Sequence, residues 1–172
     1  MITVSDNTAT NLVIDRLGTR TINRFTQEGG FAGTRLGGKL FSGRGLRSAT
    51  TPRDLGVLMA HIVRRQAVSR PASTAMLDIL RREQYDTIVG RLLPCAEDDD
   101  TGRATAWKVA SKSGSIRGHR HDVAHVEGRG IRYVVALMSR DCADLRFWVD
   151  NEAQLCLAQV ARAVHDYVAR PD

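Results

Sequence analysis

The sequence predicts an α+β fold in which helices come first, strands follow and a long helix ends the chain. Apolar residues recur at helical spacing in residues 1–93, strand-like segments follow within residues 104–139, and helical spacing then returns. Helices and strands that are segregated along the chain are typical of α+β domains. A chain of 172 residues can bury its own core, so we expect one domain over 1–172, with a mainly helical part (1–93) and a part of strands plus a C-terminal helix (104–172).

The composition is that of a globular protein, with 42% hydrophobic and 26% charged residues. The longest apolar run, Tyr133–Met138, is far shorter than the roughly 18 residues of a membrane-spanning helix, so no membrane span is expected. Met1–Val4 lead directly into Ser5 without the basic and apolar regions of a secretory signal. The chain as given is therefore expected to remain where it is made.

Charge and cysteine usage narrow the possible partners. The net charge is +6, but the arginines are scattered and aromatic residues make up only 5%, so we expect a solvated basic surface and no nucleic-acid partner. Cys95, Cys142 and Cys156 have no C-x-x-C spacing, which argues against a zinc site and against a dense disulfide framework. We interpret all three as structural.

Four helices, one long loop and a closing turn are expected in the first part. Glycines, prolines and N-capping residues mark the ends of the helices. Residues 29–49 hold seven of the 15 glycines and little periodicity, which indicates a long loop. The expected elements are helices at 8–17, Thr21–Glu28, from Thr51 onward and from Pro71 to about Arg82, followed by an apolar turn at Ile88–Leu93.

Strands and a final helix are expected in the second part. Short connections make the sheet antiparallel. The expected strands are Trp107–Ser111, His121–Glu127 and Ile131–Ser139, and the expected helix runs from Ala143 to Ala169. A solvated acidic loop, 94–103, precedes them. Three strands leave one sheet edge exposed, which predicts that an N-terminal segment of the sheet is missing.

Two short motifs carry the functional prediction. Ser5-Asp6-Asn7 opens the first helix, where such a tripeptide is by itself a common cap, and Lys112-Ser113-Gly114 falls on a strand. Thr50–Leu55, a helix start, lies between them. In this order the motifs resemble the S-D-N and K-T-G sequences of class A serine β-lactamases and penicillin-binding proteins.

The resemblance covers the whole chain and implies the β-lactamase/transpeptidase-like fold: a helical part beside an antiparallel sheet flanked by helices. Here this fold would lack its N-terminal strands and the helix that carries the nucleophile. The implied activity is opening of a β-lactam or related amide through an acyl-enzyme. The implied partner is a small β-lactam-like or peptide-like substrate, with no cofactor and no metal. A full-length member would be periplasmic or secreted.

The resemblance also implies the catalytic roles. Ser5 would relay a proton to the leaving amide nitrogen, and Lys112 would place positive charge beside it. Asn7 would hold the carbonyl of the substrate side chain.

The remaining implied residues bind substrate. Ser113 stands where the family usually has threonine and keeps the hydroxyl that binds the substrate carboxylate. Gly114 would let the strand edge approach the substrate. The N–H of Ser115 would be an oxyanion-hole donor. Either Arg117 or Arg120 would add a second cation.

Two departures from the family limit the expected activity. None of the three lysines, Lys39, Lys108 and Lys112, completes an S-x-x-K motif. The family's nucleophile and its activating lysine would therefore lie upstream of this chain, and we expect little or no turnover from the chain alone. Residues 29–50 contain no Glu or Asp that could activate a deacylating water.

Alternative sites and functions remain open. His119, His121 and His125 with Asp122 could be metal ligands, but no fourth donor is spaced for zinc. A self-contained dyad of Ser5 and Lys112 would lack a helix N-terminus as its oxyanion hole. The alternative functions are a penicillin-binding-type acyl transferase or carboxypeptidase, a non-catalytic carboxylate-binding module, and a fragment that works only with a separate N-terminal piece.

Overall fold

A computed structural model of the chain describes residues 1–43, 47–85, 87–93 and 107–170. Within these residues the elements follow the expected α+β order, which is confirmed. The elements are α1 Asn7–Leu17, α2 Thr19–Glu28, α3 Pro52–Val63, α4 Arg70–Leu80, β1 Lys108–Ile116, β2 His119–Gly128, β3 Ile131–Ser139 and α5 Glu152–Val168. The expected acidic loop 94–103, with Cys95, lies outside the described residues.

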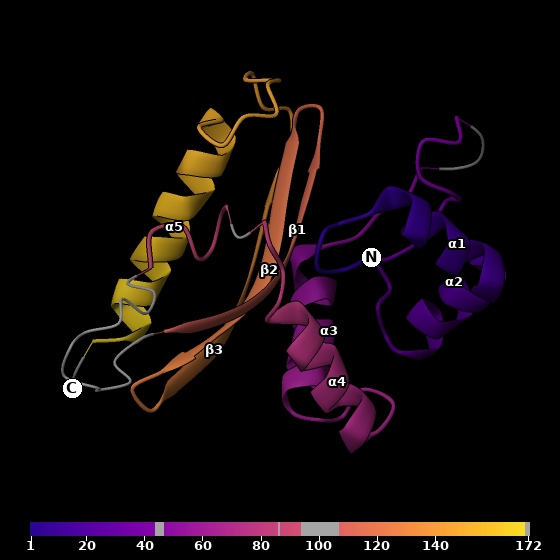
Figure 1. Cartoon of the computed structure of the whole chain (residues 1–172), viewed down its shortest axis with the longest axis horizontal. Coiled ribbons are helices and arrows are strands. Elements are labelled where there is room, and N and C mark those ends of the chain that lie inside the picture. Colours follow the sequence, from indigo (N-terminus) through magenta and orange to yellow (C-terminus); the bar gives the residue numbers. More distant parts are fainter. Residues whose placement is uncertain (44–46, 86, 94–106, 171–172) are drawn as a thin grey trace.

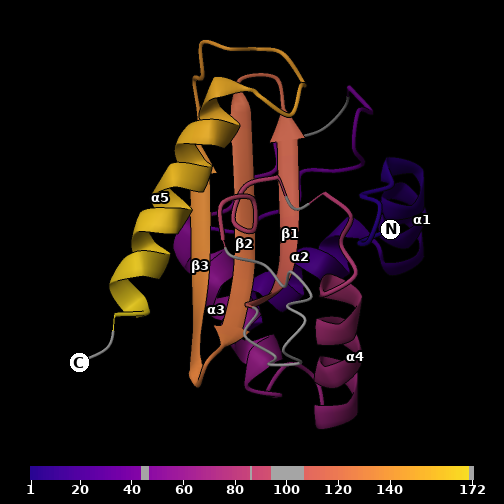
Figure 2. The same cartoon turned by 60° about the vertical axis from the view of Figure 1, so that its left-hand side comes forward.

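The sheet is antiparallel in the order β1-β2-β3 and carries helices on both faces. Figure 1 shows α5 along one face, α3 and α4 on the other, and α1 with α2 beyond them. Helix α5 packs on β2 and β3, α3 packs on the same two strands from the opposite side, and α4 packs on β1. In Figure 2 the sheet is seen nearly face-on, with α5 in front of it and α4 toward the β1 edge.

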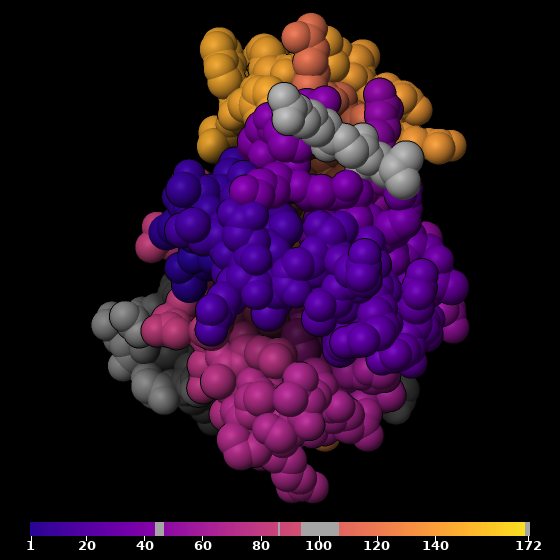
Figure 3. All heavy atoms as spheres, turned by 90° about the vertical axis from the view of Figure 1, so that its right-hand side faces the viewer, coloured from indigo at the N-terminus to yellow at the C-terminus, as the bar shows by residue number. Residues whose placement is uncertain are grey.

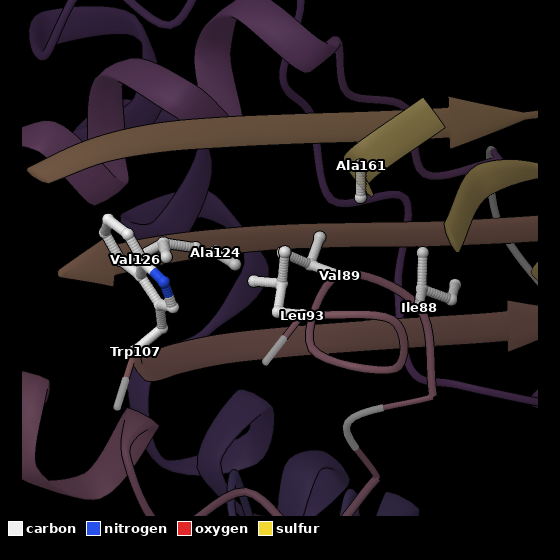
Figure 4. Packing of buried hydrophobic residues seen from close by; sticks show 7 residues of the cluster. All are labelled: Ile88, Val89, Leu93, Trp107, Ala124, Val126 and Ala161. Atoms are coloured by element: carbon white, nitrogen blue, oxygen red, sulfur yellow. The ribbon is translucent and has the colours of Figure 1, made fainter. Parts of the chain in front are cut away.

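The core on the α5 side of the sheet joins the strands to the turn that precedes them. Trp107, Ala124 and Val126 come from the sheet region, and Ala161 comes from α5. Ile88, Val89 and Leu93 of the apolar turn fill the space between, as Figure 4 shows. Because strand side chains alternate between faces, Val123 points to the opposite side from Ala124 and Val126.

The core on the other side lies between the sheet and helices α3 and α4. Met59 and Leu80 of these helices pack against Ala110 of β1 and Val123 of β2. Ile2, near the start of the chain, also packs against this cluster. The first residues of the chain are therefore held against the helical side of the sheet.

Local sequence explains where the helices begin. Thr51 caps α3, because its hydroxyl oxygen accepts a hydrogen bond from the Asp54 amide at 3.1 Å, and Pro52 follows at the first helical position. Ser69 caps α4 in the same way. No helix among the described residues is long and apolar enough to cross a membrane.

Several expected boundaries are wrong, most of all those of the last helix and of the first two strands. The last helix begins at Glu152 and not at Ala143, because residues 143–151 form a loop that ends at the N-cap Asn151. Strand β1 continues to Ile116 and β2 begins at His119, because the two pair over their whole length around a tight turn. Gly118 in this turn has a φ of 74°, in the left-handed region of backbone conformation that favours glycine.

Candidate active site

Ser5 lies in a strained turn just before α1. Its φ is 50°, in the left-handed region that costs a residue with a side chain roughly 1–2 kcal/mol. Backbone strain of this kind is concentrated at functional sites. The Ser5 amide donates to the Ile2 carbonyl oxygen at 3.3 Å, which closes the turn.

Asp6 is the residue that caps α1. One of its carboxylate oxygens accepts a hydrogen bond from the Ala9 amide at 2.5 Å. Ser5 and Asn7 are exposed on either side of it, and their side chains have no hydrogen-bond partner among the described residues. The tripeptide is thus a helix cap, yet two of its three polar side chains take no part in the cap.

The Lys-Ser-Gly motif lies on β1, as expected, at the edge of the sheet that β2 does not cover. Lys112 pairs with Val123 in the register of the two strands. Alternation along the strand puts Lys112 on the α3–α4 side with Ala110. A Cβ built at Gly114 would meet no heavy atom of the described chain within 4 Å. The described chain therefore offers no packing reason for a glycine there.

The same alternation orients two backbone amides. The Ser113 N–H points away from β2, because it donates to the Glu83 carboxylate at 3.0 Å. Residues two apart on a strand direct their N–H groups to the same edge. The Ser115 N–H, the expected oxyanion-hole donor, therefore lies on the free edge of β1.

Glu83, three residues after α4 ends, is a site residue that the sequence did not reveal. Its carboxylate accepts from the Lys112 ammonium at 2.6 Å, the Ser111 hydroxyl at 3.0 Å and the Ser113 hydroxyl at 2.9 Å. The side chain is 1% exposed. A single acid after a helix end carries no distinctive signal, so only the packing of α4 beside β1 could reveal this contact.

The start of the chain lies on the same side of the sheet as Lys112. The Gln84 amide, next to Glu83, donates to the Thr3 carbonyl oxygen at 2.9 Å. Figure 3 shows the N-terminal residues at the surface beside α4. The two motifs are thus brought to one region, although no hydrogen bond joins Ser5 to Lys112 among the described residues.

The two candidate arginines have different environments. Arg120 is 0% exposed, and its guanidinium donates to the carbonyl oxygens of Ile116 and His119, each at 2.7 Å, and to that of Arg146. Arg117 in the β1–β2 turn is exposed. Of the two, only Arg117 presents its side chain to solvent.

The histidines of β2 are packed rather than arranged around a common centre. The rings of His119 and His121 are packed edge to face, with their centroids 5.9 Å apart. Burial, reinforced by the positive charge of His119, lowers the pKa of His121. Burial also lowers the pKa of His125. Within the described ranges, no three His, Cys, Asp or Glu side chains are grouped so that they could hold a metal ion.

The glycine-rich loop is anchored to the start of α3. The buried Asp54 carboxylate accepts from the Gly33 amide at 2.9 Å and from the Thr34 hydroxyl at 2.8 Å. A Cβ on Gly33 would lie 2.5 Å from a Thr51 methyl group, so the close approach requires glycine. Asp54 is the nearest buried acid to the loop, and these contacts already occupy it.

The fold matches solved structures of β-lactamases and of PBP-A. The β-lactamase of Sphaerobacter thermophilus DSM 20745 aligns with a TM-score of 0.82 and 26% identity, over 99% of this chain and 62% of that one. PBP-A aligns with a TM-score of 0.78 and 31% identity, over 97% of this chain and 58% of that one. The class A β-lactamase of Mycobacterium abscessus, at 21% identity and a TM-score of 0.79 over 98% and 62% of the two chains, shares the fold.

These structures show that the chain has the fold of class A β-lactamases, and the expected fold class is confirmed. A comparison with curated protein sequences gives no match. The model of the β-lactamase enzyme family matches residues 1–168, and the chain belongs to that family. This chain spans about three-fifths of the length of the similar solved structures.

Proposed function

We propose that this chain forms the proton-relaying and substrate-binding wall of a serine hydrolase that opens β-lactam or related amide bonds through an acyl-enzyme. One observation carries the proposal. The strained Ser5 follows residues that pack against the helical side of the sheet, and Lys112 of β1 lies on that side. Family membership supports the general reaction class.

In this proposal, each residue of the wall acts at a stated atom. The nucleophilic serine, which this sequence does not supply in an S-x-x-K motif, attacks the amide carbonyl. The N–H of Ser115 donates to the oxygen on which negative charge develops. As the C–N bond breaks, the Ser5 hydroxyl gives its proton to the departing nitrogen and accepts the proton that left the nucleophile. The Lys112 ammonium favours this transfer by its charge.

Asn7, Ser113 and Arg117 bind the substrate in this scheme. The Asn7 amide donates to the side-chain carbonyl of the substrate. The Ser113 hydroxyl and Lys112 are the residues on which the family resemblance places a group of the substrate, and the exposed Arg117 is a cation near them. Arg120 is left out, because its guanidinium already serves backbone carbonyls. An acyl-enzyme complex with penicillin G is described for a mutant of PBP-A, which supports this chemistry in a related fold.

A penicillin-binding-type acyl transferase or carboxypeptidase is the second candidate, and the glycine-rich loop favours it. Residues 29–50 contain no carboxylate, and Asp54 is committed to the loop backbone and Thr34. Without a general base for water, the acyl-enzyme would form faster than it is hydrolysed. A burst of product followed by slow turnover would identify this variant of the reaction.

Replacing Ser5 tests the relay. We expect the chain alone to hydrolyse a chromogenic cephalosporin at the background rate, and a fusion to the N-terminal segment of PBP-A, which supplies the missing part of the fold, to be active. Ser5→Ala in that fusion should lower kcat/KM by about 10²–10⁴-fold, because the leaving nitrogen loses its proton donor.

Thr8→Ala, an exposed change in the first turn of α1, is the matched control and should leave kcat/KM within about twofold, as for most surface substitutions. Turnover by the chain alone that Ser5→Ala abolishes would make Ser5 the nucleophile and refute the relay. A fluorescent penicillin distinguishes an acyl-enzyme from a non-catalytic binding module. A label that remains on the protein after denaturation indicates an acyl-enzyme, and a label that dissociates indicates a binding module.

A further inference from the structure

The Glu83 carboxylate accepts hydrogen bonds from Lys112 and Ser113 that these residues would otherwise donate to a ligand. Ser113 has one hydroxyl proton and one amide proton, and both are donated to the Glu83 carboxylate, at 2.9 Å and 3.0 Å. The Lys112 ammonium has three protons: one is donated to Glu83 at 2.6 Å and one to the Ser113 carbonyl oxygen at 2.7 Å. One proton of Lys112 remains for any other partner.

The charge of the edge is also compensated. Lys112 and Glu83 form an ion pair in which the carboxylate side is 1% exposed and the ammonium side 25% exposed. A ligand carboxylate at Lys112 would therefore meet a nearby negative charge rather than an unpaired cation. Displacing Glu83 is unfavourable, because a buried anion would lose its donors.

The hydrogen-bonding capacity that remains on the Ser113 side chain suits a different ligand group. With its proton committed to Glu83, the Ser113 hydroxyl offers only lone pairs outward. An amide N–H or a hydroxyl group can donate to such an oxygen, whereas a carboxylate is repelled by it. The space beside Gly114 is open, so a group can approach there.

We propose that Glu83 determines substrate specificity by acting as an internal carboxylate: it occupies the donors of Lys112 and Ser113 and favours amide substrates that are neutral at this position. This inference rests on the proposed function, since it concerns the same edge of β1. It goes beyond the family resemblance, which would place a substrate carboxylate on these two residues.

Acetate and acetamide test the inference without requiring a β-lactam. Binding is followed by the backbone amide shifts of Ser113, Gly114 and Ser115 in the 172-residue chain. The wild-type chain should bind acetate no more tightly than acetamide. Glu83→Gln, which keeps the size and removes the charge, should bind acetate about tenfold more tightly than wild type, a difference of about 1.4 kcal/mol, with acetamide unchanged. A structural role alone would not change this ratio.

Asp78→Asn is the matched control, because it removes one negative charge from α4 while its carboxylate contacts Arg81 and not β1. It should leave the acetate affinity as in wild type. If Glu83→Gln fails to fold, Glu83→Asp retracts the carboxylate from the strand and should give a smaller gain in the same direction. A wild-type chain that already prefers acetate tenfold, or a folded Glu83 variant without a gain, would overturn the inference.

Benzylpenicillin and its neutral methyl ester separate this inference from the proposed function. If Glu83→Gln strengthens benzylpenicillin binding about tenfold but not binding of the ester, both proposals are supported. If neither β-lactam shifts β1 in either protein while acetate still gains in Glu83→Gln, the role of Glu83 stands and the β-lactam site is refuted.

Discussion

Arg120 joins the β1–β2 turn to the loop before α5. Its buried guanidinium donates to carbonyl oxygens in the β1–β2 turn and to that of Arg146 in the loop before α5, and it lies 5.0 Å from the Phe147 ring centroid. A buried cation needs such partners to offset the loss of water. The neighbouring Arg117 has no comparable contacts within the described chain and is exposed.

Replacing the two arginines should therefore have different effects on stability. Arg120→Met removes the charge-assisted hydrogen bonds that the guanidinium donates to the Ile116, His119 and Arg146 carbonyl oxygens, which should lower the free energy of unfolding by about 2–4 kcal/mol. Arg117→Met should change it by less than about 0.5 kcal/mol, as for most surface substitutions. Urea denaturation of both variants measures the difference. Equal losses would mean that the Arg120 contacts contribute nothing net.

Helix α5 begins where it does because of one buried asparagine. The Asn151 side-chain oxygen accepts from the Ala153 amide at 3.1 Å, and its nitrogen donates to the carbonyl oxygens of Asp144 and Arg146 at 2.9 Å and 3.0 Å. Hydrogen bonds from Arg146 hold the pKa of Asp144 well below its usual range. The loop before α5 is thus fixed by its own polar groups, which explains why the helix does not extend back to Ala143.

Loss of Asn151 should affect both the helix and the loop. Asn151→Ala removes an N-cap, for about 1 kcal/mol, and two donors to backbone carbonyls, so we expect a total loss of about 2–3 kcal/mol. Ser69→Ala, at the exposed cap of α4, is the control and should cost about 1 kcal/mol. Thermal unfolding of the two variants compares them. A larger loss for Ser69→Ala would contradict the anchoring role of Asn151.

At the scale of the whole molecule, two buried histidines and the half-buried His121 couple stability to pH. Burial is the largest cause that lowers the pKa of His121, His125 and His165 from the ordinary 6.5. His165 lies against Trp107, with ring centroids 4.4 Å apart. As pH falls below 6.5, the unfolded chain takes up protons that the folded protein does not yet bind.

The free energy of unfolding should therefore decrease as the pH falls from 6.5 toward the lowered pKa values of the folded protein. Well above pH 6.5, these three histidines should not make the free energy of unfolding depend on pH. Urea midpoints measured across this range test the prediction. His125→Asn should reduce the slope, because one of the three groups no longer titrates. Stability that rises on acidification through this window would contradict it.

The sequence predicted much of the molecule because the signals involved are local. Helical spacing, the Thr51-Pro52 start and the alternation in β2 and β3 each specify an element through neighbouring residues. The Lys-Ser-Gly motif was placed on a strand for the same reason, and the order of elements gave the α+β class. Strand β1 was expected to be shorter, because Gly114 and Ser115 weaken the local signal that pairing with β2 overrides.

By itself, the sequence determined the order of the elements, the helix caps and the two motifs, since each depends on residues that are close along the chain. Only the tertiary structure decided that Glu83 reaches Lys112 and Ser113, that Arg120 is buried while Arg117 is exposed, and that Thr3 lies beside α4. Packing of α4 against β1 brings Glu83 to Lys112 and Ser113, which are far from it in sequence, and no local pattern encodes this packing. The burial of Arg120 depends on the loop before α5, whose Arg146 carbonyl oxygen accepts from its guanidinium.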